Sequence, residues 1–344
     1  MVEEKKDFQI LSLCGGGIRG LYTISVLATL EELLAEKTNN PDYWIGQHFD
    51  LISGTSIGGI LALGLANGVT ARELLHILDK KRKIIFPNRL GYWLFFKQLF
   101  TSRREHTPLR LSLEEIFAHK TLQDLKVPVI IPAVNYTTGQ PKMFKTPHDD
   151  SFIFDKNISL VNVALATSAA PTYFPAFEIK NNLYVDGGLI ANSPCLIGWH
   201  EAINVFQRKA NEPFRIKILN IGTMAGNVVS NHKKTKWKIL NQWGFLNQWR
   251  GGERLLELTL SANESLHEFM VKHHLGDDCF LNINTQPSES QSRELSLDNA
   301  RDNAAEILIA HGNQSAATYI NNSIFKSIIS HQRNIWPFYN KRDC

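Results

Sequence analysis

Short apolar runs alternate with longer segments of helical periodicity in the first part of the chain. Residues 8–13 and 49–52 have the length and continuous apolar character of buried strands, and a glycine-rich turn follows each. Residues 21–34 then carry apolar side chains at helical spacing, and residues 57–66 form a run of small and aliphatic residues typical of a helix. The pattern predicts strand-turn-helix units, which are the building blocks of an α/β protein.

The second glycine-rich turn, Gly54-Thr55-Ser56-Ile57-Gly58, exposes a serine. This is the setting of a nucleophile elbow, because glycines two residues on either side of the serine leave room for a sharp turn. The following helix directs its N-terminal N–H groups toward the oxyanion that forms when an ester carbonyl is attacked. Ser56 is therefore a candidate nucleophile, and the alternative is a glycine-rich turn with an incidental serine.

The first turn runs from Gly15 to Gly20 with the sequence GGGIRG. Backbone N–H groups crowd together at the tip of such a turn and bind negative charge. One interpretation is an oxyanion hole, in which the N–H groups of Gly16 and Gly17 face the charge that develops beside Ser56. This interpretation accounts for both turns together.

The other interpretation of the first turn is a dinucleotide site, because its glycines satisfy G-x-G-x-x-G. Such a site needs an acidic residue at the end of the next strand, about twenty residues further on. Glu36, Asp42 and Asp50 are the acidic residues in that region, and none fits this position well. A nucleotide-binding oxidoreductase therefore stays as the alternative enzyme class.

A third element ends in Asp186-Gly187-Gly188, after the apolar residues of 183–185. By itself, an aspartate before two glycines is as well explained by a plain turn. In the company of the other two turns, the sequence resembles the patatin-like phospholipase family, whose pattern is G-G-G-x-R-G, G-x-S-x-G and a distal D-G-[GA] in that order. Further similarity lies in A-A-P-T-Y-F-P at 169–175, A-N-S-P at 191–194 and N-I-G-T at 220–223.

The resemblance covers about residues 7–225 and implies a patatin-like fold. We expect three layers, α/β/α, with a mostly parallel central sheet. Residues 226–344 read as mostly helical, with a short apolar stretch at 279–283 that is typical of an added strand. We therefore predict a phospholipase core at 7–225 and a mainly helical extension at 226–344, packed on the core.

The resemblance also implies roles for individual residues. It makes Ser56 the nucleophile and Asp186 the general base of a Ser–Asp dyad, without a metal or a cofactor. Gly16 and Gly17 would supply the oxyanion donors, and Arg19 would brace their turn. The glycines that support the three motifs are Gly15, Gly20, Gly54, Gly58, Gly187 and Gly188.

Two features leave the chemistry of the dyad partly open. Cys14 departs from the aspartate or asparagine that many relatives carry before the glycines, and we expect it to affect the surroundings of the turn more than the reaction. A Ser–Asp–His triad is the rival mechanism, because histidines follow Asp186 in the sequence: His200, His232, His267, His273, His274 and His311.

Composition narrows the class of protein further. The 344 residues are 43% hydrophobic, enough for one large α/β domain or a domain with an extension. Met1 to Asp7 is charged and carries no apolar signal core, and no apolar run is long enough to cross a bilayer, so we expect a cytoplasmic protein. Action at the inner face of the cell membrane is what the resemblance to phospholipases implies. The four cysteines have no C-x-x-C spacing, which argues against a metal site.

Cations and aromatic rings gather in two segments, residues 80–104 and 231–250. Such segments suit a transient contact with a membrane surface or a nucleotide pocket, whereas a buried lid helix and a solvated helix are their plainer interpretations. The chain resembles a bacterial branch of the family, the phospholipase effectors of anti-phage (CBASS) systems. That resemblance implies membrane phospholipid as the substrate and a cyclic dinucleotide as the activator.

Other readings of the partners and of the function remain. A homo-oligomer is left open, and no nucleic acid polymer is expected as a partner. Besides the oxidoreductase, the alternatives are a constitutive patatin-like lipid acyl hydrolase without nucleotide control and a non-catalytic sensor that keeps the fold.

Overall fold

The computed structural model describes residues 6–86, 106–225, 252–292 and 294–339. These residues build an eight-stranded sheet with the strand order β5-β6-β3-β2-β1-β7-β8, and β4 pairs with the free side of β3. The strands are β1 (Lys6–Leu13), β2 (Leu51–Gly54), β3 (Val129–Asn135), β4 (Gln140–Lys145), β5 (Phe177–Ile179), β6 (Asn182–Asp186), β7 (Phe214–Ile221) and β8 (Phe280–Ile283).

The sheet is parallel from β8 through β7, β1 and β2 to β3. Beyond β3 it becomes antiparallel, because β4 and β6 both run against β3 and β5 runs against β6. The predicted parallel sheet is therefore confirmed for its centre, and it carries an antiparallel edge. The strand predicted around residues 279–283 is β8, at the other edge of the sheet.

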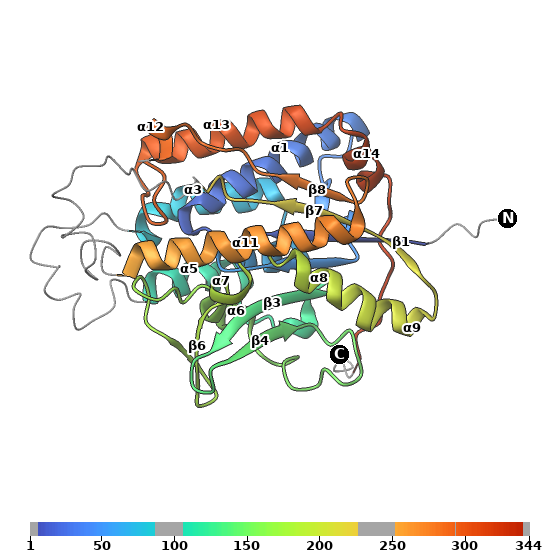
Figure 1. The fold of residues 1–344 in the computed structure, drawn as a ribbon, viewed down its shortest axis with the longest axis horizontal. Coiled ribbons are helices and arrows are strands. Elements are labelled where there is room, and N and C mark those ends of the chain that lie inside the picture. The colour runs from blue at the N-terminus through green and yellow to red at the C-terminus, as the bar shows by residue number, and fades with distance from the viewer. Residues whose placement is uncertain (1–5, 87–105, 226–251, 293, 340–344) are drawn as a thin grey trace, which may run out of the picture.

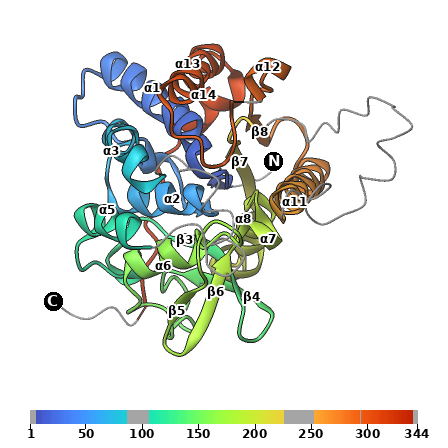
Figure 2. The same ribbon diagram turned by 90° about the vertical axis from the view of Figure 1, so that its left-hand side faces the viewer.

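Helices cover both faces of this sheet, as Figure 1 and Figure 2 show. One face carries the larger group, together with the short helices α12 (Glu289–Ser292) and α14 (Ser323–Ile329) near its edge: α1 (Gly20–Thr38), α2 (Ile57–Asn67), α3 (Ala71–Ile85), α5 (Thr107–Phe117), α6 (Leu160–Thr167) and α13 (Asp302–Tyr319). The other face carries α7 (Gly188–Ala191), α8 (Cys195–Glu201), the π-helical turn η4 (Ala202–Gln207), α9 (Arg208–Ala210) and α11 (Glu253–Leu275). The predicted three-layer α/β/α architecture is confirmed.

Strand β1 shows why the strands read as continuous apolar runs. Phe8 and Ile10 pack into the core on the side of α8, whereas Leu11 and Leu13 pack into the core on the side of α1. A strand that is covered by helices on both faces needs apolar side chains at successive positions rather than at alternate ones. This burial fixes β1 in the middle of the sheet, directly beside β2.

The described residues beyond 251 join the same sheet and core. Strand β8 extends the sheet at β7, and helix α13 packs along α1. The hydroxyl of Tyr22 in α1 lies 3.0 Å from the Ser315 hydroxyl of α13 and accepts a hydrogen bond from the Thr285 N–H. The division of the chain near residue 225 stays a prediction.

None of the helices in the described part of the chain combines the length and the apolar content that a bilayer crossing requires.

We expect Leu308→Ala in α13 to lower the free energy of unfolding by about 2–5 kcal/mol, because Leu308 is fully buried and its loss leaves a cavity. Urea denaturation of the purified protein measures this change. The matched control is Leu111→Ala, which removes a helical leucine that is 57% exposed and should cost far less. Equal effects of the two substitutions would contradict the packing of α13 on the core.

Candidate active site

The serine turn joins β2 to α2, as the sequence predicts. Ser56 stands at the N-cap of α2 with φ 54° and ψ −123°, a left-handed backbone that costs energy for a residue with a side chain. Its N–H donates to the Thr167 hydroxyl at 3.1 Å, and that hydroxyl donates to the Pro132 carbonyl at 2.7 Å. The strained turn is thus fixed by β3 and by the end of α6.

Two glycines make this turn sterically possible. A Cβ on Gly54 would lie 2.2 Å from the Gly58 carbonyl oxygen, and a Cβ on Gly58 would lie 2.3 Å from the Leu13 carbonyl oxygen. Neither contact can be relieved by a side-chain movement, because both involve backbone atoms. The G-x-S-x-G spacing is therefore required by the close approach of β1, β2 and α2.

Ser56 faces Asp186 across the sheet. The serine Oγ donates a hydrogen bond to Asp186 Oδ2 at 2.7 Å, and the Gly188 N–H donates to Asp186 Oδ1 at 2.7 Å. Asp186 is 4% exposed, and this burial raises its pKa to about 6, although both hydrogen bonds act to lower it. A buried carboxylate with a raised proton affinity can accept a proton from a serine.

The first glycine turn closes the site beside Ser56. The Gly15 N–H donates to the Asn192 carbonyl at 2.9 Å, and the Ile18 N–H donates to the Leu297 carbonyl at 3.0 Å. Between them, Gly16 and Gly17 line the same pocket as Ser56 and Asp186. Among the described residues, no hydrogen-bond acceptor lies on the N–H groups of Gly16 and Gly17. These two groups can therefore receive an oxyanion.

Arg19 lies within the turn and is buried, with 8% of its surface exposed. Its backbone N–H donates to the Gly16 carbonyl at 3.2 Å, and its Nε has no hydrogen-bond partner among the described residues. Burial lowers the pKa of Arg19, whereas the negative charges of Glu257 and Glu264 act to raise it. The structure therefore gives Arg19 an electrostatic link to α11.

Helix α11 holds the turn through Asn192. The Asn192 side-chain amide donates to the Gly15 carbonyl at 3.3 Å and to Glu264 Oε2 at 2.5 Å. Asn263 accepts from the Asn192 N–H at 2.7 Å and donates to the Gly188 carbonyl at 2.7 Å. Two adjacent residues of α11 thus connect the Gly15 turn with the Asp186 turn.

In the described part of the chain, no histidine lines the pocket that contains Ser56. His267 contacts the Ser193 carbonyl at 3.0 Å and His274 the carbonyl of Met270 at 2.8 Å, which fixes their rings elsewhere. His232 lies outside the described residues. Among the residues that the structure describes, the side-chain acceptor bonded to Ser56 Oγ is the carboxylate of Asp186.

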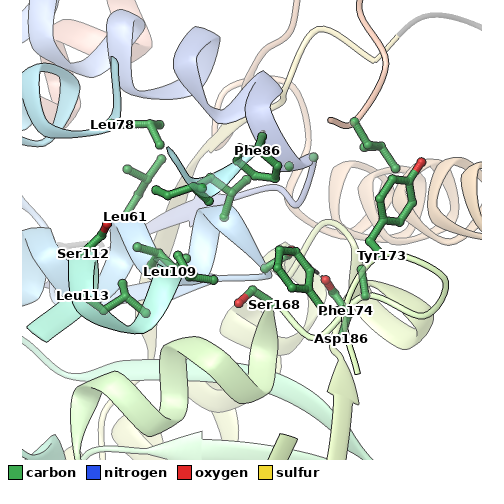
Figure 3. A pocket seen from close by; sticks show the side chains of 18 of the residues that line it. Leu61, Leu78, Phe86, Leu109, Ser112, Leu113, Ser168, Tyr173, Phe174 and Asp186 are labelled. Carbon is green, nitrogen blue, oxygen red and sulfur yellow. Dashed lines mark hydrogen bonds between the residues drawn. The ribbon is translucent and has the colours of Figure 1, made fainter. Parts of the chain in front are cut away.

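An apolar pocket extends from Ser56 between the helices (Figure 3). Asp186 and Ser168 lie at one end, and Leu78, Ser112 and Leu113 lie at the other. The pocket contains about 1010 Å³ of empty space, including the open solvent at its entrance. It is enclosed by aliphatic residues of α2, α3, α5 and α11, so it suits a hydrocarbon chain.

The profile of the patatin-like phospholipase family matches residues 11–199. A curated relative from Escherichia coli (strain TW11681), named cGAMP-activated phospholipase, is 41% identical over 325 residues, covering 91% of this chain and 90% of the relative. A relative with the same name from Vibrio cholerae serotype O1 is 39% identical over 332 residues, covering 91% of each chain. The chain belongs to the patatin-like phospholipase family.

A solved structure, human GIVD cytosolic phospholipase A2, is 12% identical, with a TM-score of 0.40, and the match covers 95% of this chain and 59% of that one.

Membership of the patatin-like family confirms the predicted enzyme class, a phospholipase. Membership also accounts for the three glycine-rich motifs without a dinucleotide-binding site at the Gly15–Gly20 turn. The two segments rich in cations and rings cannot be placed in this site, because most of residues 80–104 and all of 231–250 lie outside the described residues.

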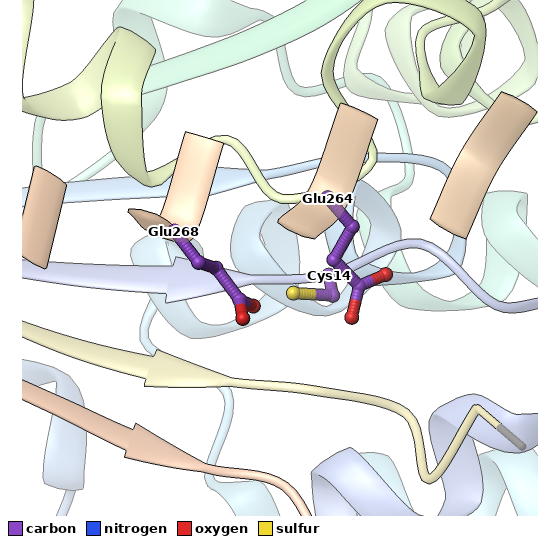
Figure 4. A group of neighbouring side chains, drawn as sticks. All are labelled: Cys14, Glu264 and Glu268. Atoms are coloured by element: carbon purple, nitrogen blue, oxygen red, sulfur yellow. The ribbon is translucent and has the colours of Figure 1, made fainter. Parts of the chain in front are cut away.

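Beside the Gly15–Gly20 turn of this patatin-like enzyme, Cys14 Sγ and the carboxylates of Glu264 and Glu268 lie within 4.8 Å of one another (Figure 4). Within the described ranges, these are the residues that could hold a metal ion. Both carboxylates already accept amide hydrogen bonds, Glu264 from Asn192 and Glu268 from Asn220. Burial and the charge of Glu264 raise the pKa of Glu268 to about 7, and burial raises the pKa of Cys14. Protons and amide donors thus satisfy the cluster.

Sequence reasoning missed the residues that hold the turns. Thr167, Asn263 and Glu264 lie outside the three glycine motifs. Asn192 was visible only as part of the A-N-S-P block. A signal that could have found Glu264 is its position among apolar residues on one side of a helix, where an unpaired carboxylate is costly to bury.

We expect the kcat/KM of ester hydrolysis to rise with pH through about 6 and then to level off, because Asp186 accepts a proton only as a carboxylate and its pKa is raised to about 6. Asp186→Asn should lower kcat by about a hundredfold or more, since an amide cannot take the proton. Initial rates from pH 4.5 to 9 measure both effects. A profile without an inflection near pH 6 would contradict the role of Asp186 as the base.

We expect Glu264→Leu to lower kcat by about tenfold with little change in KM, because the side-chain amide of Asn192 loses its acceptor and the oxyanion turn is held less firmly. Glu264→Gln is the matched control, since its amide oxygen still accepts that hydrogen bond and its neutral side chain suits the buried site. Activity that falls equally in both variants would show that the negative charge matters instead of the hydrogen bond.

Proposed function

We propose that this patatin-like phospholipase hydrolyses acyl esters of membrane phospholipids through a dyad of Ser56 and Asp186. The observation that carries the proposal is the 2.7 Å hydrogen bond from Ser56 Oγ to Asp186 Oδ2 at one end of an apolar pocket. Nucleophile and base need this distance for proton transfer, and the pocket supplies a place for the acyl chain.

In the first half of the reaction, Ser56 Oγ attacks the ester carbonyl carbon while Asp186 takes the hydroxyl proton. The carbonyl oxygen becomes an oxyanion, which the N–H groups of Gly16 and Gly17 and the N-terminus of α2 stabilise. The tetrahedral intermediate then expels the lysophospholipid alkoxide, which receives the proton from Asp186. Ser56 is left as an acyl ester, and Asp186 is again a carboxylate.

In the second half, a water molecule attacks the acyl ester and gives its proton to Asp186. Collapse of the second tetrahedral intermediate breaks the bond to Ser56 Oγ and returns the proton to it. The products are a free fatty acid and the original enzyme. The same donors stabilise both oxyanions, because both form at the same carbonyl oxygen.

Control by a cyclic dinucleotide is the second part of the proposal. The two relatives named above are cGAMP-activated phospholipases, and each matches this chain over about nine tenths of its length. A phospholipase that is always active inside a cell would destroy the membrane of its host. An activating nucleotide must therefore bind the active arrangement much more tightly than the resting one.

The proposed setting is anti-phage defence, with the enzyme acting at the inner face of the cell membrane. A nucleotide messenger made inside the cell would reach the enzyme there, beside its lipid substrate. A homo-oligomer formed on activation is compatible with this scheme and belongs to the same proposal.

We expect fatty acid release from vesicles of phosphatidylglycerol and phosphatidylethanolamine only when cGAMP is present, with at least about a hundredfold loss in Ser56→Ala, because the acyl-enzyme cannot form. Release is measured by mass spectrometry. The substitution control is Ser290→Ala, an exposed serine of α12 outside the pocket, which should keep wild-type release. Release that needs Ser56 but not the nucleotide would keep the hydrolase and contradict its control. Release that is unaffected by Ser56→Ala would contradict the dyad.

A further inference from the structure

Helix α11 exposes an apolar stripe along its outer side. The stripe consists of Leu255, Leu258, Ala262, Leu266 and Phe269, which are all exposed. Their spacing of three or four residues places them on one face of the helix. Phe269 is 68% exposed and Leu266 is 54% exposed. Single exposed apolar residues are common on protein surfaces, but a continuous stripe of them on one helix indicates an interaction surface.

The same helix forms part of the wall of the active site. Leu256 and Leu260, on its inner side, line the pocket that contains Ser56. Leu260 lies close to the Asp186 turn, since a Cβ on Gly188 would be 2.5 Å from its side chain. Figure 1 shows α11 crossing the near face of the molecule, from the region of α5 to that of α8. Helix α11 therefore separates the apolar stripe on its outer side from the pocket on its inner side.

The five residues of the apolar stripe carry no charge. The stripe itself carries no carboxylate, and the acidic side chains of Glu264 and Glu268 point inward to the cluster behind the oxyanion turn. At the C-terminal end of the helix, Lys272 and His273 are exposed, although Lys272 pairs with Asp277 at 2.8 Å. Asp277 and Asp278 are exposed just beyond the helix, so the fit to a bilayer comes from the uncharged stripe, which can enter the apolar boundary without burying a charge.

We propose that the apolar stripe of α11 is the surface through which the enzyme docks on the phospholipid bilayer. The inference rests on the proposed function, because it is the lipid substrate of the pocket that identifies a bilayer as the occupant. An amphipathic helix lies in the plane of a membrane with its apolar face at the boundary between headgroups and acyl chains. In that position, the inner side of α11 faces the pocket while its outer side contacts lipid, so a chain can leave the bilayer beside Leu256 and Leu260.

The test uses a double variant, Leu266→Asp with Phe269→Asp, in the full-length protein with cGAMP present. Partitioning onto vesicles of phosphatidylglycerol and phosphatidylethanolamine is measured by flotation. We expect it to fall by at least about tenfold, because two carboxylates replace the most exposed apolar side chains of the stripe. Fatty acid release from the vesicles should fall in step. Hydrolysis of a water-soluble short-chain ester should stay at the wild-type rate, since neither residue lines the pocket.

Two further variants make the comparison specific. Phe154→Asp is the matched control, because Phe154 is 79% exposed and lies outside α11. It should leave both flotation and ester hydrolysis unchanged. The double variant Leu266→Ser with Phe269→Ser removes the apolar surface without adding charge, and we expect its flotation to fall by an intermediate amount. This second variant keeps the test valid if the aspartate variant fails to fold.

Wild-type flotation of both double variants would overturn the docking surface. The docking surface would also be overturned if the wild-type protein sediments as a dimer, the double variants sediment as monomers and flotation stays unchanged. The stripe would then bind a second copy of the chain. If the wild-type protein hydrolyses neither the vesicle lipid nor the soluble ester, the proposed function fails, and the flotation comparison still decides the docking surface.

Discussion

Ser56 holds a backbone φ of 54°, and the arrangement of the active site depends on this one strained residue. The strain persists because β1, β2 and α2 approach so closely that Gly54 and Gly58 have no room for a side chain. The same turn directs Ser56 Oγ toward Asp186 and ends where the N–H groups of α2 begin. The position of Ser56 relative to both Asp186 and the N-terminus of α2 therefore follows from this one turn.

The remaining parts of the site come from distant segments that the sheet brings together. Asp186 stands at the end of β6, which runs antiparallel to β3, whereas Ser56 follows the parallel strand β2. Helix α11 lies beyond residues 11–199, to which the family profile extends, yet its Asn263 and Glu264 hold both motif turns. The C-terminal part of the chain is thus built into the candidate active site.

Burial sets the electrostatics of this region. It raises the pKa of Asp186 to about 6, which makes the carboxylate a better base than an exposed aspartate while it still ionises below neutral pH. It also raises the pKa of Glu268 to about 7, so this carboxyl group beside Cys14 ionises as the pH rises through that value. A raised folded-state pKa of an acid means that the folded state loses stability as the pH rises from the unfolded value of the group to the folded one. This holds for Asp186 as well as for Glu268, so a rise in pH ionises the candidate base while it lowers stability through both carboxyl groups.

The sequence by itself determined the local elements and the residues of the motifs. Apolar runs with glycine turns predicted β1, β2 and α2 because their signals lie within a few neighbouring residues, and the distal D-G-G turn identified Asp186 through its family pattern. Only the tertiary structure decided that Ser56 and Asp186 meet at 2.7 Å, that Asn192 and Glu264 hold the oxyanion turn, and that α11 has a pocket side and an exposed apolar side. These relations join residues up to 177 positions apart, and such distances are set by how strands pair and helices pack, which no local pattern records.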